Sequence, residues 1–135
     1  MPGTVELARE VMDAVSHQDA ERLVALADPD VEWHSFFAIG EDGAYRGHEG
    51  TRRYARDLVD AFEVVLAEIE DTFAVGDIAL LVGRIHYRGK GSGVESEAPV
   101  LWVLRFRAGK VVFFRAFRNP EDALAGLAQG AYPQA

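Results

Sequence analysis

Apolar residues recur every three or four positions in three stretches of the N-terminal half of this 135-residue chain, a spacing that predicts amphipathic helices. The first is expected over residues 5–16, with Thr4 as its N-cap and an inward stripe of Ala8, Val11, Met12 and Val15. The second is expected to begin after Asp19 and to end before Pro29, because the residue ahead of a proline avoids helical geometry. The third is expected over residues 48–63, with an inward face formed by Thr51, Tyr54, Ala55, Leu58 and Phe62.

The rest of the chain alternates apolar and polar residues with the period of β-strands. A short strand is expected over residues 31–37, and four longer strands over residues 64–75, 78–88, 94–107 and 110–118. Glycine-containing turns separate the four longer strands, as in consecutive hairpins. Helices followed by hairpins favour an α+β domain in which a curved antiparallel sheet packs one face against the helices.

Strand alternation also separates the two faces of the sheet, because successive side chains point to opposite sides. Val100, Trp102, Leu104 and Phe106 form an entirely apolar row that is expected to face the helices. The two rows of residues 78–88 resemble one another, so the alternation leaves open whether His86 faces a cavity or the surface. A bulge near the following glycine-rich loop would reverse every side chain of that strand.

Length and composition narrow the class of protein. The 135 residues predict a single domain, 1–135, with a core over about residues 5–127. A formal net charge of −8 opposes binding to nucleic acid, and the absence of cysteine excludes thiolate chemistry and disulfides. Four charged residues within positions 1–15 argue against a signal peptide or a membrane span. We therefore expect a soluble cytoplasmic protein with neither a nucleic-acid nor a membrane partner.

Several short motifs follow one another in a fixed order. They are DPDVEW at residues 28–33, YRGHEG at 45–50, GKGSG at 89–93, RFRAGKVV at 105–112 and EDALAGL at 121–127. Together they resemble the SnoaL-like polyketide cyclases and the ketosteroid isomerases of the nuclear-transport-factor-2-like superfamily. The resemblance implies a cone-shaped α+β fold, with a curved antiparallel sheet packed against N-terminal helices.

The resemblance also indicates where catalytic groups would lie. Ketosteroid isomerases use a carboxylate base, and a protonated aspartic acid and a tyrosine that donate hydrogen bonds to the developing oxyanion. The base position aligns with Trp33, the acid with Trp102 and the tyrosine with a position near Val11. The essential aspartate of the cyclases also aligns with Trp102. We therefore expect no ketosteroid isomerase activity, and the catalytic residues of any reaction stay unknown.

Six side chains are candidates for binding a ligand: Trp33, Tyr54, His86, Trp102, Phe114 and Arg118. On the last strand the isomerase resemblance places Val112, Phe114, Ala116 and Arg118 inward, with Arg118 near the open end of the cone. The two tryptophans form either flat apolar walls of a pocket or part of a filled core. Tyr54 is either a hydroxyl donor or a core phenol.

The remaining charged residues are expected to have structural roles. Arginines on the long strands should form cross-strand pairs on the outer face, joining Arg84, Arg88, Arg105 and Arg115 with Glu68, Glu70, Glu95 and Glu97. His48 marks the start of the third helix. The four histidines lack the spacing of metal ligands, so neither a metal site nor a cofactor is predicted.

Two kinds of function stay open. One is a small enzyme that isomerises, cyclises, dehydrates or hydrates a hydrophobic metabolite without a cofactor. The other is a non-catalytic module that binds an apolar ligand or forms a dimer. In both cases the expected partners are a small hydrophobic molecule and a second copy of the chain. The homodimer is expected because an apolar patch would otherwise be exposed on the outer face of the sheet, formed by Leu101, Val103, Val111, Phe113 and Phe117.

Overall fold

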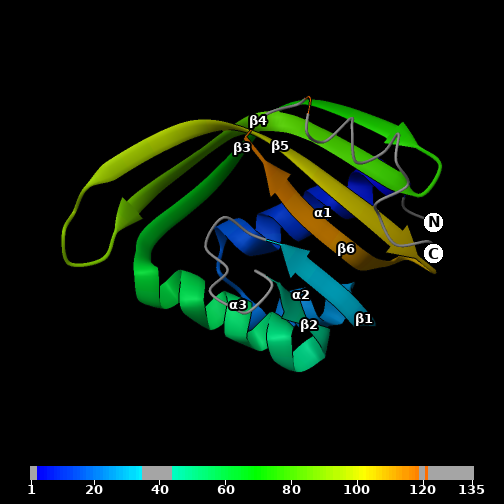
Figure 1. Cartoon of the computed structure of the whole chain (residues 1–135), viewed down its shortest axis with the longest axis horizontal. Coiled ribbons are helices and arrows are strands. Elements are labelled where there is room, and N and C mark those ends of the chain that lie inside the picture. The colour runs from blue at the N-terminus through cyan, green and yellow to red at the C-terminus, as the bar shows by residue number, and fades with distance from the viewer. Residues whose placement is uncertain (1–2, 35–43, 119–120, 122–135) are drawn as a thin grey trace.

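The computed structural model contains three helices and five strands in the predicted order, and a short strand at Tyr45–Arg46 that was not predicted (Figure 1). It describes residues 3–34, 44–118 and 121. The helices are α1 (Thr4–Ser16), α2 (Ala20–Leu26) and α3 (Gly47–Ala61), and the strands are β1 (Ala27–His34), β2 (Tyr45–Arg46), β3 (Phe62–Val75), β4 (Ile78–Gly89), β5 (Glu95–Arg107) and β6 (Lys110–Phe117). The end of the predicted first strand, residues 35–37, lies outside the described residues. So do the loop after it and the motif at 121–127, apart from Glu121.

The six strands form one sheet in the order β2-β1-β6-β5-β4-β3. Neighbouring strands are antiparallel except for β1 and β6, which pair in parallel. The predicted α+β class is therefore confirmed, with a mixed sheet in place of the wholly antiparallel one expected. Figure 1 shows the long strands curving around the helices, so that the sheet has a concave inner face and a convex outer face. None of the described helices is long and apolar enough to cross a membrane.

The main core lies between the helices and the inner face of the sheet. The predicted stripe of α1 and four of the five inward residues predicted for α3 are buried. The apolar row on β5 faces the helices, as predicted, since Val100, Trp102, Leu104 and Phe106 all belong to this core. Asp19 caps α2 by accepting a hydrogen bond from the backbone N–H of Arg22 at 3.2 Å.

The predicted cap of α1 is wrong. Gly3 occupies the N-cap position, and Thr4 is the first helical residue. The Thr4 hydroxyl instead donates to the backbone carbonyl of Gly76 at 3.0 Å. This hydroxyl therefore ties the start of α1 to the turn between β3 and β4, a contact between residues 72 positions apart.

A second apolar cluster lies on the outer face and consists of Leu101, Val103, Val112, Phe113 and Phe117. These side chains are only 0–8% exposed within a single chain. The exposed patch expected on this face is therefore not present: all five of its members are buried, and one of them, Val111, belongs to the inner core. A single chain therefore does not expose these side chains.

The orientation of two residues at the start of β6 is the reverse of the one expected. Val111 belongs to the inner core, whereas Val112 belongs to the outer cluster. The cause is a bulge: Phe106 on β5 lies opposite Val111, while Arg105 lies opposite Phe113, which leaves Val112 as an extra residue. From Phe113 onward the expected alternation is restored, and Phe114 points inward.

Candidate functional site

Four aromatic rings meet on the inner face where β1, β2, α3 and β6 come together. Ring centroids lie 5.3 Å apart for Trp33 and Tyr54, 5.1 Å for Trp33 and Phe114, and 5.4 Å for Tyr45 and Tyr54. Tilted rings at these separations attract one another beyond the effect of burial. All four residues are at most 5% exposed. We call Trp33, Tyr45, Tyr54 and Phe114 the aromatic cluster; three of them are predicted ligand-binding residues.

A buried hydrogen bond holds Trp33 in this cluster. Its indole Nε1–H donates to the Thr51 hydroxyl at 2.8 Å, and that hydroxyl donates to the backbone carbonyl of Gly47 at 2.8 Å. Both Trp33 and Thr51 are 0% exposed. The bond joins β1 to α3, so the indole N–H is used by the protein itself and is not available to orient a ligand.

A tyrosine and a carboxylate lie together at the edge of the cluster. The Tyr45 hydroxyl donates a hydrogen bond to Asp57 Oδ2, and Asp57 is half-buried on α3. Glycine at position 50 permits this arrangement, because an added Cβ would lie 3.0 Å from the carbonyl carbon of Tyr45. The absence of that side chain allows β2 to lie close against α3.

Sequence reasoning alone misses this pair. In the sequence Tyr45 stands out only as part of a motif, and Asp57 falls on the polar side of the third helix. One signal is present: Asp57 follows Tyr54 by three positions, and residues with that spacing are neighbours on a helix surface.

The positions that align with the isomerase catalytic groups contain buried apolar residues. Trp33 is 0% exposed, Val11 on α1 is 0% exposed and Trp102 on β5 is 3% exposed. Trp102 lies on the inner face, where it pairs with Leu81 on β4 and Ala116 on β6. These three positions cannot accept or donate a proton as a carboxyl group would.

The other two predicted site residues, His86 and Arg118, do not belong to the aromatic cluster. Of the two alternatives for His86, the structure has the outer face, because Leu80 and Val82 on the same side of β4 pack against the outer cluster. Leu81 and Ile85, on the opposite side of the strand, belong to the inner core. Arg118 is exposed and directly follows β6.

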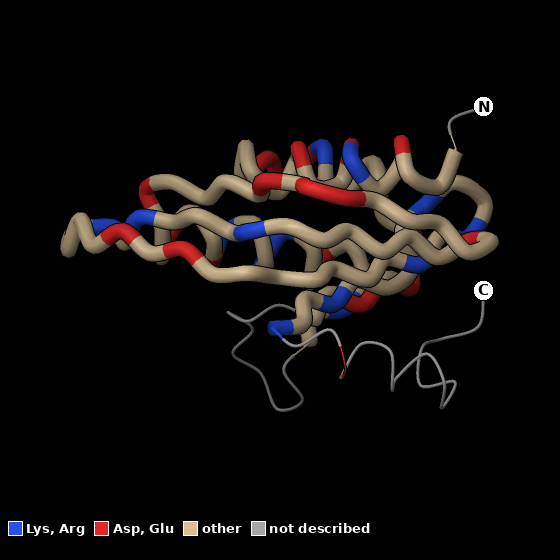
Figure 2. The backbone as a smooth tube through the Cα atoms, turned by 90° about the horizontal axis from the view of Figure 1, so that it is seen from above, with Lys and Arg blue, Asp and Glu red and all other residues tan. Residues whose placement is uncertain are grey.

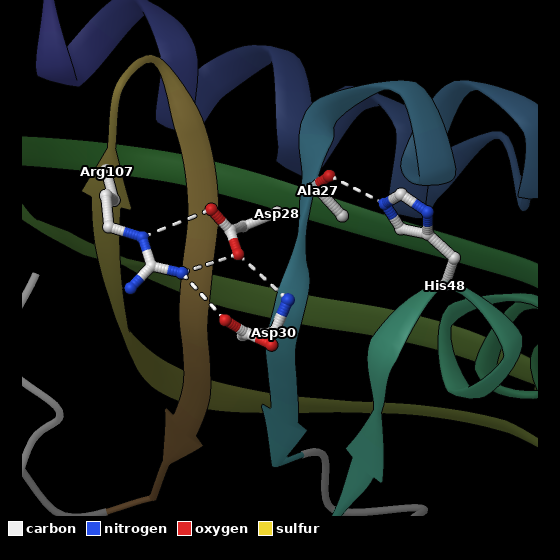
Figure 3. Close-up of polar contacts among 5 residues, drawn as sticks. All are labelled: Ala27, Asp28, Asp30, His48 and Arg107. Carbon is white, nitrogen blue, oxygen red and sulfur yellow. Dashed lines mark hydrogen bonds and ion pairs between the residues drawn. The ribbon is translucent and has the colours of Figure 1, made fainter.

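A charged cluster stands at the start of β1 (Figure 3). Arg107 on β5 donates to both carboxylate oxygens of Asp28, at 2.7 and 3.2 Å, and to Asp30 at 3.1 Å. The backbone N–H of Asp30 also donates to Asp28, at 2.8 Å. The hydrogen bond from Arg107 lowers the pKa of Asp28 below its ordinary value, and the backbone bond adds to this effect. The same contacts raise the pKa of Arg107.

Two further contacts show that this end of the molecule has a structural role. His48 Nε2 lies 2.9 Å from the carbonyl oxygen of Ala27, and the Lys110 ammonium donates to the carbonyl of Ala25 at 2.7 Å. Because a carbonyl oxygen only accepts, the His48 contact requires a proton on Nε2. These contacts and the Asp28 cluster join the α2–β1 junction to α3 and to the β5–β6 hairpin.

Among residues 3–34, 44–118 and 121, no group of three or more histidine, aspartate or glutamate side chains is arranged to hold a metal ion. The acid–base groups that lie at the aromatic cluster are the Tyr45 hydroxyl and the Asp57 carboxylate.

The model of the SnoaL-like domain matches residues 8–114. No protein of curated function matches the sequence.

Solved structures share the fold. A nuclear-transport-factor-2-like protein of unknown function from Burkholderia pseudomallei superposes with a TM-score of 0.75 at 18% identity, over 93% of this chain and 97% of that one. A protein with a ketosteroid isomerase-like fold from Catenulispora acidiphila also scores 0.75, at 20% identity, over 91% and 92%. An LEH-like epoxide hydrolase from M. tuberculosis scores 0.71 at 16% identity, over 95% and 91%. Identities this low show a common fold alone.

Proposed function

Because this chain belongs to the SnoaL-like domain family, we propose that it binds a small, largely apolar molecule beside the aromatic cluster and transfers a proton on that molecule. The proton-transfer groups in this proposal are Asp57 and Tyr45, and no cofactor takes part. The observation that carries the proposal is the hydrogen bond from the Tyr45 hydroxyl to the Asp57 carboxylate, next to aromatic rings.

The chemistry of this pair suits the reactions expected from the sequence. Isomerisation, cyclisation, dehydration and hydration all need a proton to leave one atom and reach another. A carboxylate oriented by a hydroxyl group can take a proton from carbon or oxygen. Once Asp57 carries that proton, the Tyr45 O–H no longer has to donate to it and can turn to a substrate oxygen that gains negative charge. Aromatic walls bind apolar molecules and exclude water.

The proposed class of function is the one expected from the sequence, but the proposed acid–base residues are different. The sequence suggests Tyr54, His86 and Arg118 around a tryptophan-lined pocket. His86 lies on the outer face, so the pair of Tyr45 and Asp57 replaces it as the acid–base group. Tyr54 stays part of the site through its ring, which contacts both Tyr45 and Trp33.

A second candidate is a module that binds an apolar molecule without chemistry. It is favoured by the buried apolar side chains at the three positions that align with isomerase catalytic groups, Trp33, Trp102 and Val11. The two candidates agree on an apolar ligand and differ on the role of Asp57.

Exchange of carbon-bound protons separates the two candidates. The probe is 2-tetralone, an apolar ketone with acidic C–H bonds, dissolved in heavy water with the purified protein. Nuclear magnetic resonance measures the loss of its α-protons, and tryptophan fluorescence measures its binding. We expect exchange to be faster than in buffer, and Asp57→Asn to slow this accelerated exchange by about 100-fold or more while binding is retained.

Two further variants complete the test. Tyr45→Phe should slow exchange less than Asp57→Asn, because it leaves the carboxylate in place. Asp60→Asn removes an exposed carboxylate from the same helix and should have no effect. Binding without accelerated exchange in the unmodified protein would favour the non-catalytic module, and equal exchange in the Asp57 and Asp60 variants would rule out the proposed base.

A further inference from the structure

Two segments that are distant in the sequence hold the last turn of α3. The first is the turn between α1 and α2, where the side-chain amide of Gln18 donates to the carbonyl of Leu58 at 2.9 Å and to the carbonyl of Phe62 at 3.2 Å. The second is the hairpin between β4 and β5, where the backbone N–H of Lys90 donates to the carbonyl of Ala61 at 3.0 Å. These contacts tie the end of the helix to the α1–α2 turn and to the sheet.

This end of α3 needs such donors, because the last carbonyl groups of a helix have no partners within the helix. The chain also passes directly from the helix at Ala61 into β3 at Phe62, with no loop between them whose backbone could supply the donors. The N–H of Phe62 closes the last helical bond, to Leu58. Gln18 and Lys90 therefore supply donors that this corner of the chain lacks.

Gln18 has an unusual backbone conformation for a residue with a side chain. Its φ of 53° lies in the left-handed region, which favours glycine. A non-glycine residue in such a conformation points to a role for its side chain. An amide nitrogen carries two N–H groups, so the Gln18 side chain can bond both carbonyls at the end of α3 at once. Glycine would relieve the backbone but would remove both bonds.

The bonds from Gln18 lie next to a residue of the proposed proton-transfer pair. Asp57 directly precedes Leu58 on α3, and its carboxylate accepts the hydrogen bond from the Tyr45 hydroxyl. Tyr45 comes from β2, a strand of two residues that pairs with β1. The position of Asp57 relative to Tyr45 therefore depends on where the end of α3 lies against the sheet, and the bonds from Gln18 help to fix that end.

We infer that Gln18 is a positioning residue for the pair of Asp57 and Tyr45. This inference rests on the proposed function, because it adds to that site a residue that touches neither the ligand nor the reacting atoms. By bonding the carbonyls of Leu58 and Phe62, the Gln18 amide keeps the last turn of α3 from fraying. The Asp57 carboxylate then stays within reach of both the Tyr45 hydroxyl and a bound ketone.

Two substitutions separate the amide bonds from the backbone conformation. Gln18→Met keeps the length of the side chain and the left-handed backbone but removes both donors, whereas Gln18→Gly removes both donors and relieves the backbone. Both should lower the maximal rate of 2-tetralone proton exchange by about tenfold, since a small displacement of a reacting group can cost up to about 100-fold. The 2-tetralone concentration that gives half the maximal rate should not change. Gln18→Gly should nevertheless unfold at a higher temperature than Gln18→Met.

The hydroxyl proton of Tyr45 provides a second measurement, one that needs no turnover. A hydroxyl proton held by a carboxylate exchanges slowly with water and gives its own proton magnetic resonance signal, which Tyr45→Phe identifies. In Gln18→Met and Gln18→Gly this proton should exchange with water faster than in the unmodified protein, because Asp57 is no longer held in place. Both variants should lose this protection although they differ in thermal stability.

The β4–β5 hairpin offers a matched pair of control variants. Lys90→Met removes an exposed ammonium that lies 3.4 Å from the carbonyl of Val59, and it should slow proton exchange less than Gln18→Met, because the backbone bond of Lys90 remains. Arg88→Met removes a cation from the same hairpin, where acidic and basic positions are interspersed along the strands (Figure 2). Arg88 pairs with Glu95 at 3.0 Å, as predicted from the sequence, so its loss should not change the rate.

Three results would overturn the inference. The first is a Gln18→Met variant with the exchange rate and the Tyr45 signal of the unmodified protein. The second is recovery of the rate in Gln18→Gly, which would show that stability and not the amide bonds sets the rate. The third is an equal loss of rate in Arg88→Met. If the unmodified protein did not accelerate exchange at all, the proposed function would be wrong, and the Tyr45 signal would decide the role of Gln18 by itself.

Discussion

The indole N–H of Trp33 donates to the Thr51 hydroxyl at 2.8 Å, and neither residue is exposed to solvent. Trp33 lies on β1 and Thr51 lies one turn into α3, so this bond fixes the helix against the strand. It also determines where the ring of Tyr54, on the same helix, meets the indole. A polar contact between two buried side chains therefore helps to hold the aromatic cluster together.

Replacing Thr51 with Val should lower the free energy of unfolding by about 1–3 kcal/mol, because the buried indole N–H would lose its acceptor while the shape of the side chain is kept. Urea denaturation followed by tryptophan fluorescence measures this change. Thr51→Ser retains the hydroxyl and should cost clearly less. If the two variants were equally stable, the hydrogen bond would have no role in holding the cluster.

The charged cluster of Asp28 and Arg107 predicts a dependence of stability on pH. The pKa of Asp28 is lowered in the folded protein, so its carboxylate stabilises the fold above the pKa of an unfolded aspartate, about 3.9. That contribution is lost as the pH falls through the lower folded-state pKa. Asp28→Asn should therefore be less stable than the unmodified protein at neutral pH, and the difference should shrink below about pH 3.9.

Unfolding free energies measured from pH 7 down into this acidic range test the prediction. Asp60→Asn, on the exposed side of α3, serves as the control and should follow the unmodified protein throughout. If the difference in unfolding free energy between Asp28→Asn and the unmodified protein grew as the pH fell, the result would contradict the prediction.

Gly83 on β4 allows β3 and β4 to approach each other closely. A Cβ at this position would lie 1.9 Å from the backbone oxygen of Glu68 on β3, just before the irregular pairing between Ile69 and Asp71. Gly83→Ala should therefore force the two strands apart and cost about 1–3 kcal/mol or more, because both partners in the clash are backbone-linked.

Gly109→Ala provides a comparison with a different mechanism. Gly109 has a φ of 78°, and a methyl group added to its Cα would have no other atom within 4 Å. Its substitution therefore costs only the left-handed conformation, about 1–2 kcal/mol. Hydrogen exchange distinguishes the two variants: Gly83→Ala should speed exchange in β3 and β4, whereas Gly109→Ala should not. Unchanged protection of β3 in Gly83→Ala would contradict the clash.

Much of the fold could be predicted because it follows from local periodicity. The stripe of α1, the apolar row of β5 and the cap at Asp19 all depend on residues close in sequence, and the structure confirms them. The orientation of Val111 and Val112 could not be predicted, because a bulge depends on how β5 and β6 pair. Strand alternation carries no information about an extra residue until the partner strand is known.

The candidate site was harder to predict than the fold for a similar reason. Trp33, Tyr54 and Phe114 could be recognised because aromatic residues on an inner face stand out in the sequence. Tyr45 and Asp57 meet across 12 positions, and their contact depends on the close approach of β2 to α3 at Gly50. His86 was ambiguous because both rows of β4 contain apolar residues, and only the surrounding strands determine which row faces the helices.

The homodimer expected from the sequence needs a different surface, because the outer cluster is buried within one chain. Phe113 is only 4% exposed within one chain, so its side chain contributes little surface to an interface. Large apolar residues that are exposed lie on β3, where Phe73 is 51% and Val75 is 66% exposed. They lie opposite Leu80 and Ile78 on β4 and extend the outer face to the edge of the sheet.

We expect a second copy of the chain to cover this part of the outer face, since exposed apolar side chains that adjoin one another favour association. A stable dimer should bury at least about 1,000 Å² in total, and sedimentation at micromolar concentration should report twice the mass of one chain. Phe73→Asp should shift the protein to a monomer that stays folded, because Phe73 is 51% exposed and contributes little to the core of one chain. Val94→Asp changes an equally exposed apolar residue outside this surface, at 62% exposure, and should leave the dimer intact. If the unmodified protein sedimented as a monomer at this concentration, the prediction of a homodimer would be wrong.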